Sequence, residues 1–93
     1  MPDKLTIGGM EYRIVEVDQI SKDEFINGEI DYLDGVIKID STMTHDRKMI
    51  TLVHEVLHGI CDALGMSELG ENENAIQSLA STLYSTFKGT KIF

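Results

Sequence analysis

Two histidines and a glutamate lie within five consecutive residues near the middle of the chain, in the order His54-Glu55-Val56-Leu57-His58. On an α-helix, residues four apart are neighbours on one face, so both imidazoles can hold the same metal ion. Glu55 is rotated by about 100° from His54, which lets its carboxylate reach a water molecule at an open coordination position. The spacing is typical of zinc hydrolases. We predict a catalytic Zn²⁺ bound by His54 and His58 with Glu55 as general base; the alternative is two surface histidines beside an ordinary helical glutamate.

This spacing has a chemical meaning only on a helix, and the flanking residues predict one over residues 44–64. Thr44 is a suitable N-cap, Asp46 lies in the positively polarised first turn, and Gly65 follows the last apolar residue. Apolar residues cover about half of the circumference, namely Ile50, Leu52, Val53, Val56, Leu57, Ile60, Cys61 and Leu64. The remaining arc is polar and holds Thr51, His54, Glu55, His58 and Asp62. We expect one side of this helix to pack into a core and the other to line a cleft.

A zinc hydrolase needs a third protein ligand. Asp62 lies about 12 Å from His54 along the helix axis, too far for both to bind one ion, and is expected to line the cleft. A second helix is predicted over residues 72–88 from the spacing of Ile76, Leu79, Ala80, Leu83, Tyr84 and Phe87. Glu73 falls within this apolar arc, so its carboxylate would face inward and need a counter-charge that a metal ion supplies. We predict Glu73 as the third ligand; it could instead interact with the N–H groups of its own helix, and Glu68 is a more distant candidate.

The residues before these helices predict a hairpin. Gly8-Gly9 separates residues 5–7 from residues 11–17, and glycine accepts the positive φ of a tight hairpin turn. A capping-box pattern at residues 21–24 predicts one short helical turn, ended by Asn27-Gly28.

A second hairpin is expected at Asp34-Gly35, which separates residues 29–33 from residues 36–40 and is the strongest short hairpin signal in the chain. Both hairpins precede the two predicted helices. We therefore expect an α+β fold in which a small, antiparallel-rich sheet of two hairpins packs on the motif helix and the following C-terminal helix.

Composition favours one domain spanning residues 1–93, because the chain has 93 residues and contains no repeat or linker. Sixteen acidic against eight basic residues give a net charge of −8, which disfavours nucleic acid and anionic membrane surfaces as partners. No apolar run approaches the length of a spanning helix and no signal-peptide pattern occurs at the start, which predicts a cytoplasmic protein. The single cysteine, Cys61, is expected to be a buried apolar residue rather than a ligand.

The segment from Arg47 to His58 resembles the active-site segment of the ImmA/IrrE-type metallopeptidases, gluzincin-like enzymes that are often found in phages and mobile elements. Residues 73–80 resemble the next helix of that family, in which a glutamate supplies the third zinc ligand. The resemblance extends over about residues 37–84. This chain has Leu57, Asp62 and Gln77 where the family commonly has glycine, histidine and asparagine.

The resemblance implies a zinc metallopeptidase with His54, His58 and Glu73 as ligands and Glu55 as the general base that activates a water molecule. It also implies that an edge strand at residues 36–40 receives a protein or peptide substrate by strand addition. For stabilising the oxyanion, the sequence offers His45 and Tyr32.

A second class of function is also open, namely a zinc-binding interaction module in which the metal supports folding and nothing is hydrolysed. The presence of Glu55 favours the enzyme, because a structural site needs no additional carboxylate beside an open position. The oligomeric state is not predicted.

Overall fold

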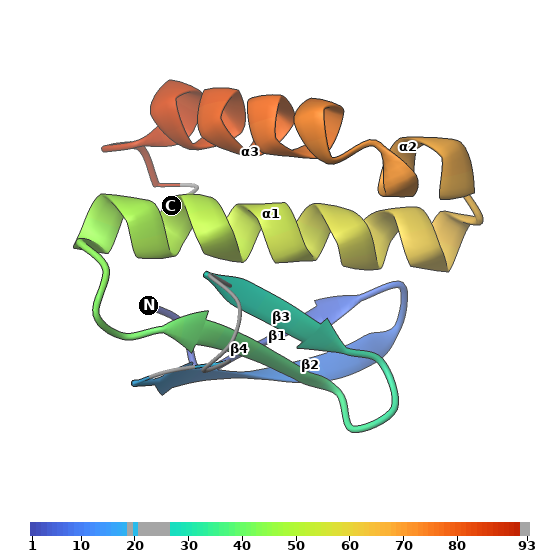
Figure 1. Ribbon diagram of the computed structural model, residues 1–93, viewed down its shortest axis with the longest axis horizontal. Coiled ribbons are helices and arrows are strands. Elements are labelled where there is room, and N and C mark those ends of the chain that lie inside the picture. The colour runs from blue at the N-terminus through green and yellow to red at the C-terminus, as the bar shows by residue number, and fades with distance from the viewer. Residues whose placement is uncertain (19, 21–26, 92–93) are drawn as a thin grey trace.

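The computed structural model describes residues 1–18, 20 and 27–91, and these residues form the expected α+β fold. Its four described strands are β1 (Lys4–Ile7), β2 (Met10–Val17), β3 (Gly28–Asp31) and β4 (Val36–Asp40). Its three described helices are α1 (His45–Leu64), α2 (Ser67–Glu71) and α3 (Glu73–Phe87). Figure 1 shows three layers: the sheet, then α1, then α2 with α3. The short helical turn predicted at residues 21–24 lies outside the described residues.

The first hairpin is confirmed. β1 and β2 pair antiparallel, with Ile7 opposite Met10. Gly8 and Gly9 make the turn with φ of 57° and 85°, values that favour glycine over any residue with a side chain. A Cβ atom on Gly8 would lie only 2.7 Å from the Cβ atom of Ala63. The turn therefore also packs closely against the C-terminal part of α1.

The second hairpin forms, but its turn differs from the prediction. β3 and β4 pair antiparallel, and β3 ends at Asp31, before the residues that were expected to complete it. The Asp31 carboxylate accepts hydrogen bonds from the backbone N–H groups of Leu33 and Asp34, each at 3.0 Å. Only Gly35 in this turn has positive φ. A side chain that caps its own loop competes with strand pairing, so a longer turn replaces the two-residue Asp-Gly turn.

The strand order is β1-β2-β4-β3, with β2 and β4 parallel. β4 is therefore paired on both sides, and the expectation that Val36–Asp40 forms an edge strand open to a substrate is wrong. The physical reason is burial, because a central strand covers the apolar side chains of β4 better than an edge strand does. The edge on this side of the sheet is β3. Ile37 and Ile39 in β4 are fully buried, as suits a central strand.

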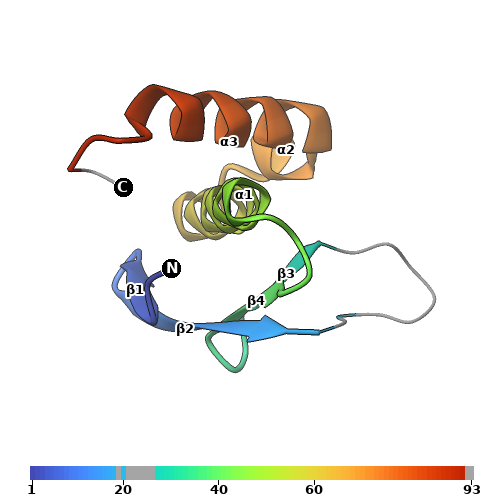
Figure 2. The same ribbon diagram turned by 90° about the vertical axis from the view of Figure 1, so that its left-hand side faces the viewer.

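Helix α1 has the predicted ends. The Thr44 side chain accepts a hydrogen bond from the backbone N–H of Arg47 at 3.4 Å, and Gly65 ends the helix in the left-handed conformation at φ 69°. Its faces differ from the prediction, because α1 lies between the sheet and α3 and both of its sides are covered (Figure 2). Thr51 and Glu55 of the expected polar arc are buried.

Two apolar positions of α1 are also exposed against expectation. Ile60 and Leu64 are 38% and 67% exposed, although the helical wheel placed them on the core side. Both lie in the last turns of the helix. The apolar arc thus predicts burial less well toward the C-terminal end.

Helix α3 packs antiparallel along α1 and is held at its C-terminal end by Asp46. The Asp46 carboxylate accepts hydrogen bonds from the Tyr84 hydroxyl at 2.7 Å and from the Lys88 ammonium at 3.0 Å. These donors hold the pKa of Asp46 below its usual range. Ile76, Ala80 and Tyr84 are buried as predicted, but Leu79 is 41% exposed. The antiparallel arrangement brings the start of α3 beside the middle of α1, where the motif histidines lie.

Within the described residues, no helix combines the length and the apolar character needed to span a membrane.

Replacing Ile37 by Ala is expected to destabilise the fold by about 2–5 kcal/mol, because the side chain is fully buried and its removal leaves a cavity. Urea unfolding followed by circular dichroism measures this loss. Leu33→Ala is the matched control, since the Leu33 side chain is 96% exposed and its loss should change stability little. Equal destabilisation by both variants would contradict the packing described for β4.

Candidate metal centre

The three predicted ligands lie together. His54 and His58 extend from successive turns of α1, and Glu73 is the first residue of α3. The two histidine Nε2 atoms are 3.2 Å apart. The Glu73 carboxylate oxygens lie 3.1 Å from His54 Nε2 and 2.9 Å from His58 Nε2. One ligand atom from each of the three residues thus falls within 4.8 Å of the others.

This arrangement fits a zinc ion. Ligand atoms at the corners of a tetrahedral site with metal bonds of about 2.0–2.2 Å are about 3.3–3.6 Å apart. The two histidine Nε2 atoms, 3.2 Å apart, are close to that spacing, and one Glu73 oxygen lies 3.1 Å from His54 Nε2 while the other lies 2.9 Å from His58 Nε2. Two imidazoles and one carboxylate are also the protein ligands of many catalytic zinc sites, which keep a fourth position open.

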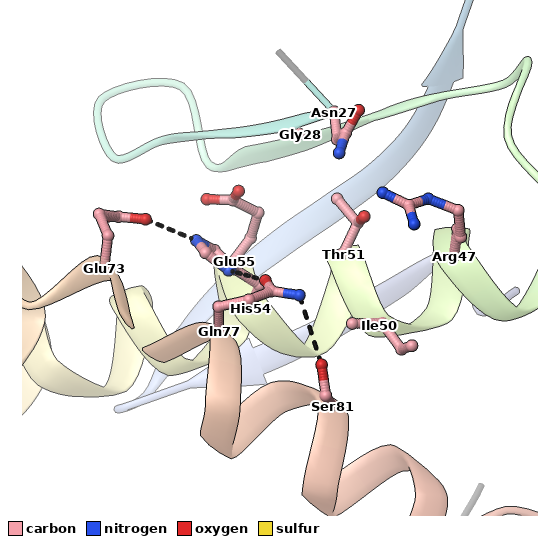
Figure 3. Close-up of a pocket in the computed structure, with 10 residues that line it drawn as sticks. All are labelled: Asn27, Gly28, Arg47, Ile50, Thr51, His54, Glu55, Glu73, Gln77 and Ser81. Carbon is pink, nitrogen blue, oxygen red and sulfur yellow. Dashed lines mark hydrogen bonds and ion pairs between the residues drawn. The ribbon is translucent and has the colours of Figure 1, made fainter. Parts of the chain in front are cut away.

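Gln77 fixes the orientation of the His54 ring. The Gln77 side-chain Oε1 lies 2.8 Å from His54 Nδ1, and its Nε2 donates to the Ser81 hydroxyl at 3.3 Å (Figure 3). Since the amide oxygen can only accept, His54 Nδ1 is the donor in this contact. Neutral His54 therefore carries its proton on Nδ1 and directs the lone pair of Nε2 at Glu73 and His58. Lone pairs that converge in this way need a cation or a proton between them.

Gln77→Leu is expected to weaken zinc binding by about 10- to 100-fold, because the His54 ring loses the acceptor that fixes its tautomer. Gln77→Glu keeps an acceptor at this position and should retain high affinity. Competition with a fluorescent zinc chelator measures both. Equal affinities in the wild type and the leucine variant would show that Gln77 does not support the ligand.

The burial of Glu73 differs from the prediction. Its side chain is 65% exposed, whereas the helical wheel placed it in the apolar, inward-facing arc. Glu73 does lie on the side of α3 that faces α1, but it is the first residue of the helix, and its carboxylate contacts the α1 histidines while most of the side chain stays open to solvent. The inference that a buried acid requires the ion does not hold, and the support for Glu73 as a ligand is its distance to both histidines.

Glu55 lies beside these three residues without joining them. It is 8% exposed and packs beneath β3, where a Cβ atom on Gly28 would come within 3.1 Å of Glu55 Oε2. Burial raises the pKa of Glu55 to about 7, an effect that Glu73 and Glu29 strengthen and His54 opposes. A divalent cation held by the histidines would lower this pKa. Figure 3 shows the carboxylate on the β3 side of His54.

Two cavities flank the histidines. The first, of about 510 Å³, includes His54 and Glu55 and extends along α1 as far as Arg47. The second, of about 220 Å³, lies beside His58. A peptide bound across the candidate metal centre would therefore have a cavity on each side of the two histidines.

The other residues considered from the sequence have different positions. Tyr32 and Asp62 line the second cavity, in agreement with the cleft position expected for Asp62. His45 is the first residue of α1 and lines neither cavity, so it is not brought to the centre. Glu68 is in α2, an unexpected helix, and is not part of the ligand group. Cys61 is buried and free, as predicted.

The sequence pattern indicates no functional role for Gln77, and for Gly28 it predicts only the end of a short helical turn. Gln77 follows Glu73 by one helical turn, and this spacing is the signal that could have placed it near the ligands. Gly28 makes room for Thr51 and Glu55 under β3, which depends on contacts between distant segments and leaves no local signal.

Comparisons of the chain with protein-family models, with curated proteins and with solved structures found no match.

Proposed function

We propose that this protein is a zinc-dependent peptidase that hydrolyses a peptide bond of a protein substrate. The observation that carries the proposal is a buried carboxylate, Glu55, next to two histidines and a glutamate whose ligand atoms are spaced for one zinc ion. The motif residues support a relationship to the ImmA/IrrE-type metallopeptidases, in a minimal form such as phages and mobile elements carry. We place the activity in the cytoplasm, where the single cysteine would stay reduced.

His54, His58 and Glu73 would hold the metal. A zinc ion there would act as a Lewis acid that lowers the pKa of water toward neutrality and polarises the substrate carbonyl. Glu55 accepts the proton that water loses as its oxygen attacks the carbonyl carbon, and then donates this proton to the leaving amine. Gln77 keeps His54 in the required tautomer throughout.

Tyr32 is the candidate for stabilising the oxyanion. It lines the cavity beside His58, and burial, together with Asp62 and other nearby acidic groups, raises its pKa. Its hydroxyl therefore stays protonated at neutral pH and can donate a hydrogen bond.

The edge strand β3 is the proposed place for an extended substrate. Asn27 and Gly28 line the first cavity, and Tyr32, just after β3, lines the second. A peptide that adds to the open side of β3 would thus pass both cavities. Strand addition is proposed here rather than at Val36–Asp40, whose backbone groups are already paired.

The test is hydrolysis of a library of defined peptides by the zinc-loaded protein, with the products identified by mass spectrometry. We expect cleavage at specific bonds, its loss when a chelator removes the metal, and its return when zinc is added. Zinc that raises the melting temperature without any cleavage would contradict the peptidase and favour the alternative, a zinc-binding interaction module.

A further inference from the structure

Arg47 is the one lysine or arginine among the described residues that line the first cavity. It lies on α1, two turns before His54, and is exposed. Figure 3 shows its guanidinium turned toward Thr51, on the side where Asn27, the residue before β3, is located. The far end of the cavity therefore offers a cation next to two neutral polar side chains.

Among the described residues, none neutralises the Arg47 guanidinium through an ion pair. Lys4, Lys48 and Lys88 form ion pairs with Glu11, Glu16 and Asp46, respectively. In the part of the chain that the structure describes, no carboxylate pairs with Arg47. An unpaired guanidinium at a cavity is a good receptor for a carboxylate, which it can bind through two parallel hydrogen bonds.

The distance along α1 limits which substrate group can reach Arg47. The seven residues from Arg47 to His54 correspond to a rise of about 10 Å. An extended peptide covers this length with about three residues. The group that meets the guanidinium thus lies within about three residues of the bond at the metal centre.

The direction follows from β3. This strand runs from Gly28, at the first cavity, toward Tyr32, at the second. A peptide paired antiparallel, the more stable arrangement per residue, runs the opposite way. Its residues after the cleaved bond then lie in the first cavity, on the side of Arg47.

We propose that Arg47 binds a substrate carboxylate located within about three residues on the C-terminal side of the cleaved bond. This inference rests on the proposed peptidase function. The carboxylate belongs either to an Asp or Glu side chain or to the free C-terminus of a short substrate, and both present the same group to the guanidinium.

Matched peptides test the proposal on the zinc-loaded protein. In the first pair, both peptides have an amidated C-terminus, and the three positions after the cleaved bond are all Glu in one peptide and all Gln in the other. In the second pair, these three positions are Gln in both peptides, and the C-terminus that follows them is a free acid in one and an amide in the other. We expect kcat/KM to favour the acid of one pair by about 10- to 100-fold, and the favoured pair identifies the source. Arg47→Gln should reduce this ratio to near one, whereas Arg13→Gln, which removes the same charge from an exposed site on β2, should preserve it.

A preference that survives in Arg47→Gln, or ratios near one for both pairs in the wild type, would overturn the proposal. If no peptide is cleaved, the peptidase proposal fails, and binding of fluorescent versions of the same peptides to the zinc-loaded Glu55→Gln protein still tests Arg47. Tighter binding of the acid, lost on adding Arg47→Gln, would support a carboxylate site; equal binding would overturn it.

Discussion

Glu55→Gln is expected to lower kcat by about 10²- to 10⁴-fold while one zinc ion per chain stays bound. The amide has the shape of the carboxylate but cannot accept the proton of the attacking water. Glu55 is close to the candidate ligands without being one of them, so zinc affinity should remain within a few fold of the wild-type value. Initial rates on a cleaved peptide, measured alongside the zinc content by mass spectrometry, give both quantities.

Glu68→Gln is the control for this variant. Glu68 is exposed on α2 and lines neither cavity, so the same chemical change there should leave kcat as in the wild type. Full activity in a zinc-loaded Glu55→Gln protein would rule out Glu55 as the general base. Loss of zinc in that variant would instead make Glu55 a ligand, against the geometry of the centre.

His58→Ala is expected to weaken zinc binding by more than about 100-fold, because a direct ligand contributes more than an orienting group such as Gln77. Zinc at 100 times its dissociation constant should stabilise the wild-type protein by about 2.7 kcal/mol. For a domain of this size, that corresponds to a rise in melting temperature on the order of 10–20 °C. The variant should lose this rise almost completely.

Isothermal titration of the metal-free proteins with zinc, followed by thermal melting, measures both effects of the His58 variant. His45→Ala is the matched control, since it removes an exposed histidine from the start of the same helix. We expect it to bind one zinc ion as the wild type does. Unchanged affinity in His58→Ala would remove this residue from the ligand set.

The features that the sequence predicted correctly have local causes. Thr44 and Gly65 mark the ends of α1 through the chain next to them, and Gly8-Gly9 makes its turn whatever the rest of the sheet does. The spacing of His54 and His58 is likewise a property of one helix. Such features follow from neighbouring residues alone.

The features that were wrong or absent depend on long-range packing. The periodicity of Val36–Asp40 indicates a strand but does not say which strands pair with it, and the insertion of β4 between β2 and β3 changed the proposed substrate edge. Burial of Glu55 likewise requires β3 above it, with Gly28 at the point of contact. A strand's periodicity and the helical wheel of one helix cannot predict the pairing of β4 or the burial of Glu55 under β3.

Glu73 combines both kinds of inference. Its position on the side of α3 that faces α1 was predictable from helical spacing, but its exposure depends on where α3 starts relative to α1. That alignment is held by the contacts of Asp46 with Tyr84 and Lys88 at the other end of the helix pair. Helical spacing therefore placed Glu73 correctly beside His54 and His58, but the burial of Glu73 on which that prediction rested is not observed.

The most direct test of the metal centre is X-ray diffraction from crystals of the zinc-loaded protein, with anomalous differences measured at the zinc absorption edge. We expect one strong peak, bonded at about 2.0–2.2 Å to Nε2 of His54, Nε2 of His58 and a carboxylate oxygen of Glu73, with Glu55 nearby but not coordinated. A peak bonded to other residues, or no peak between the two histidines, would contradict the assignment.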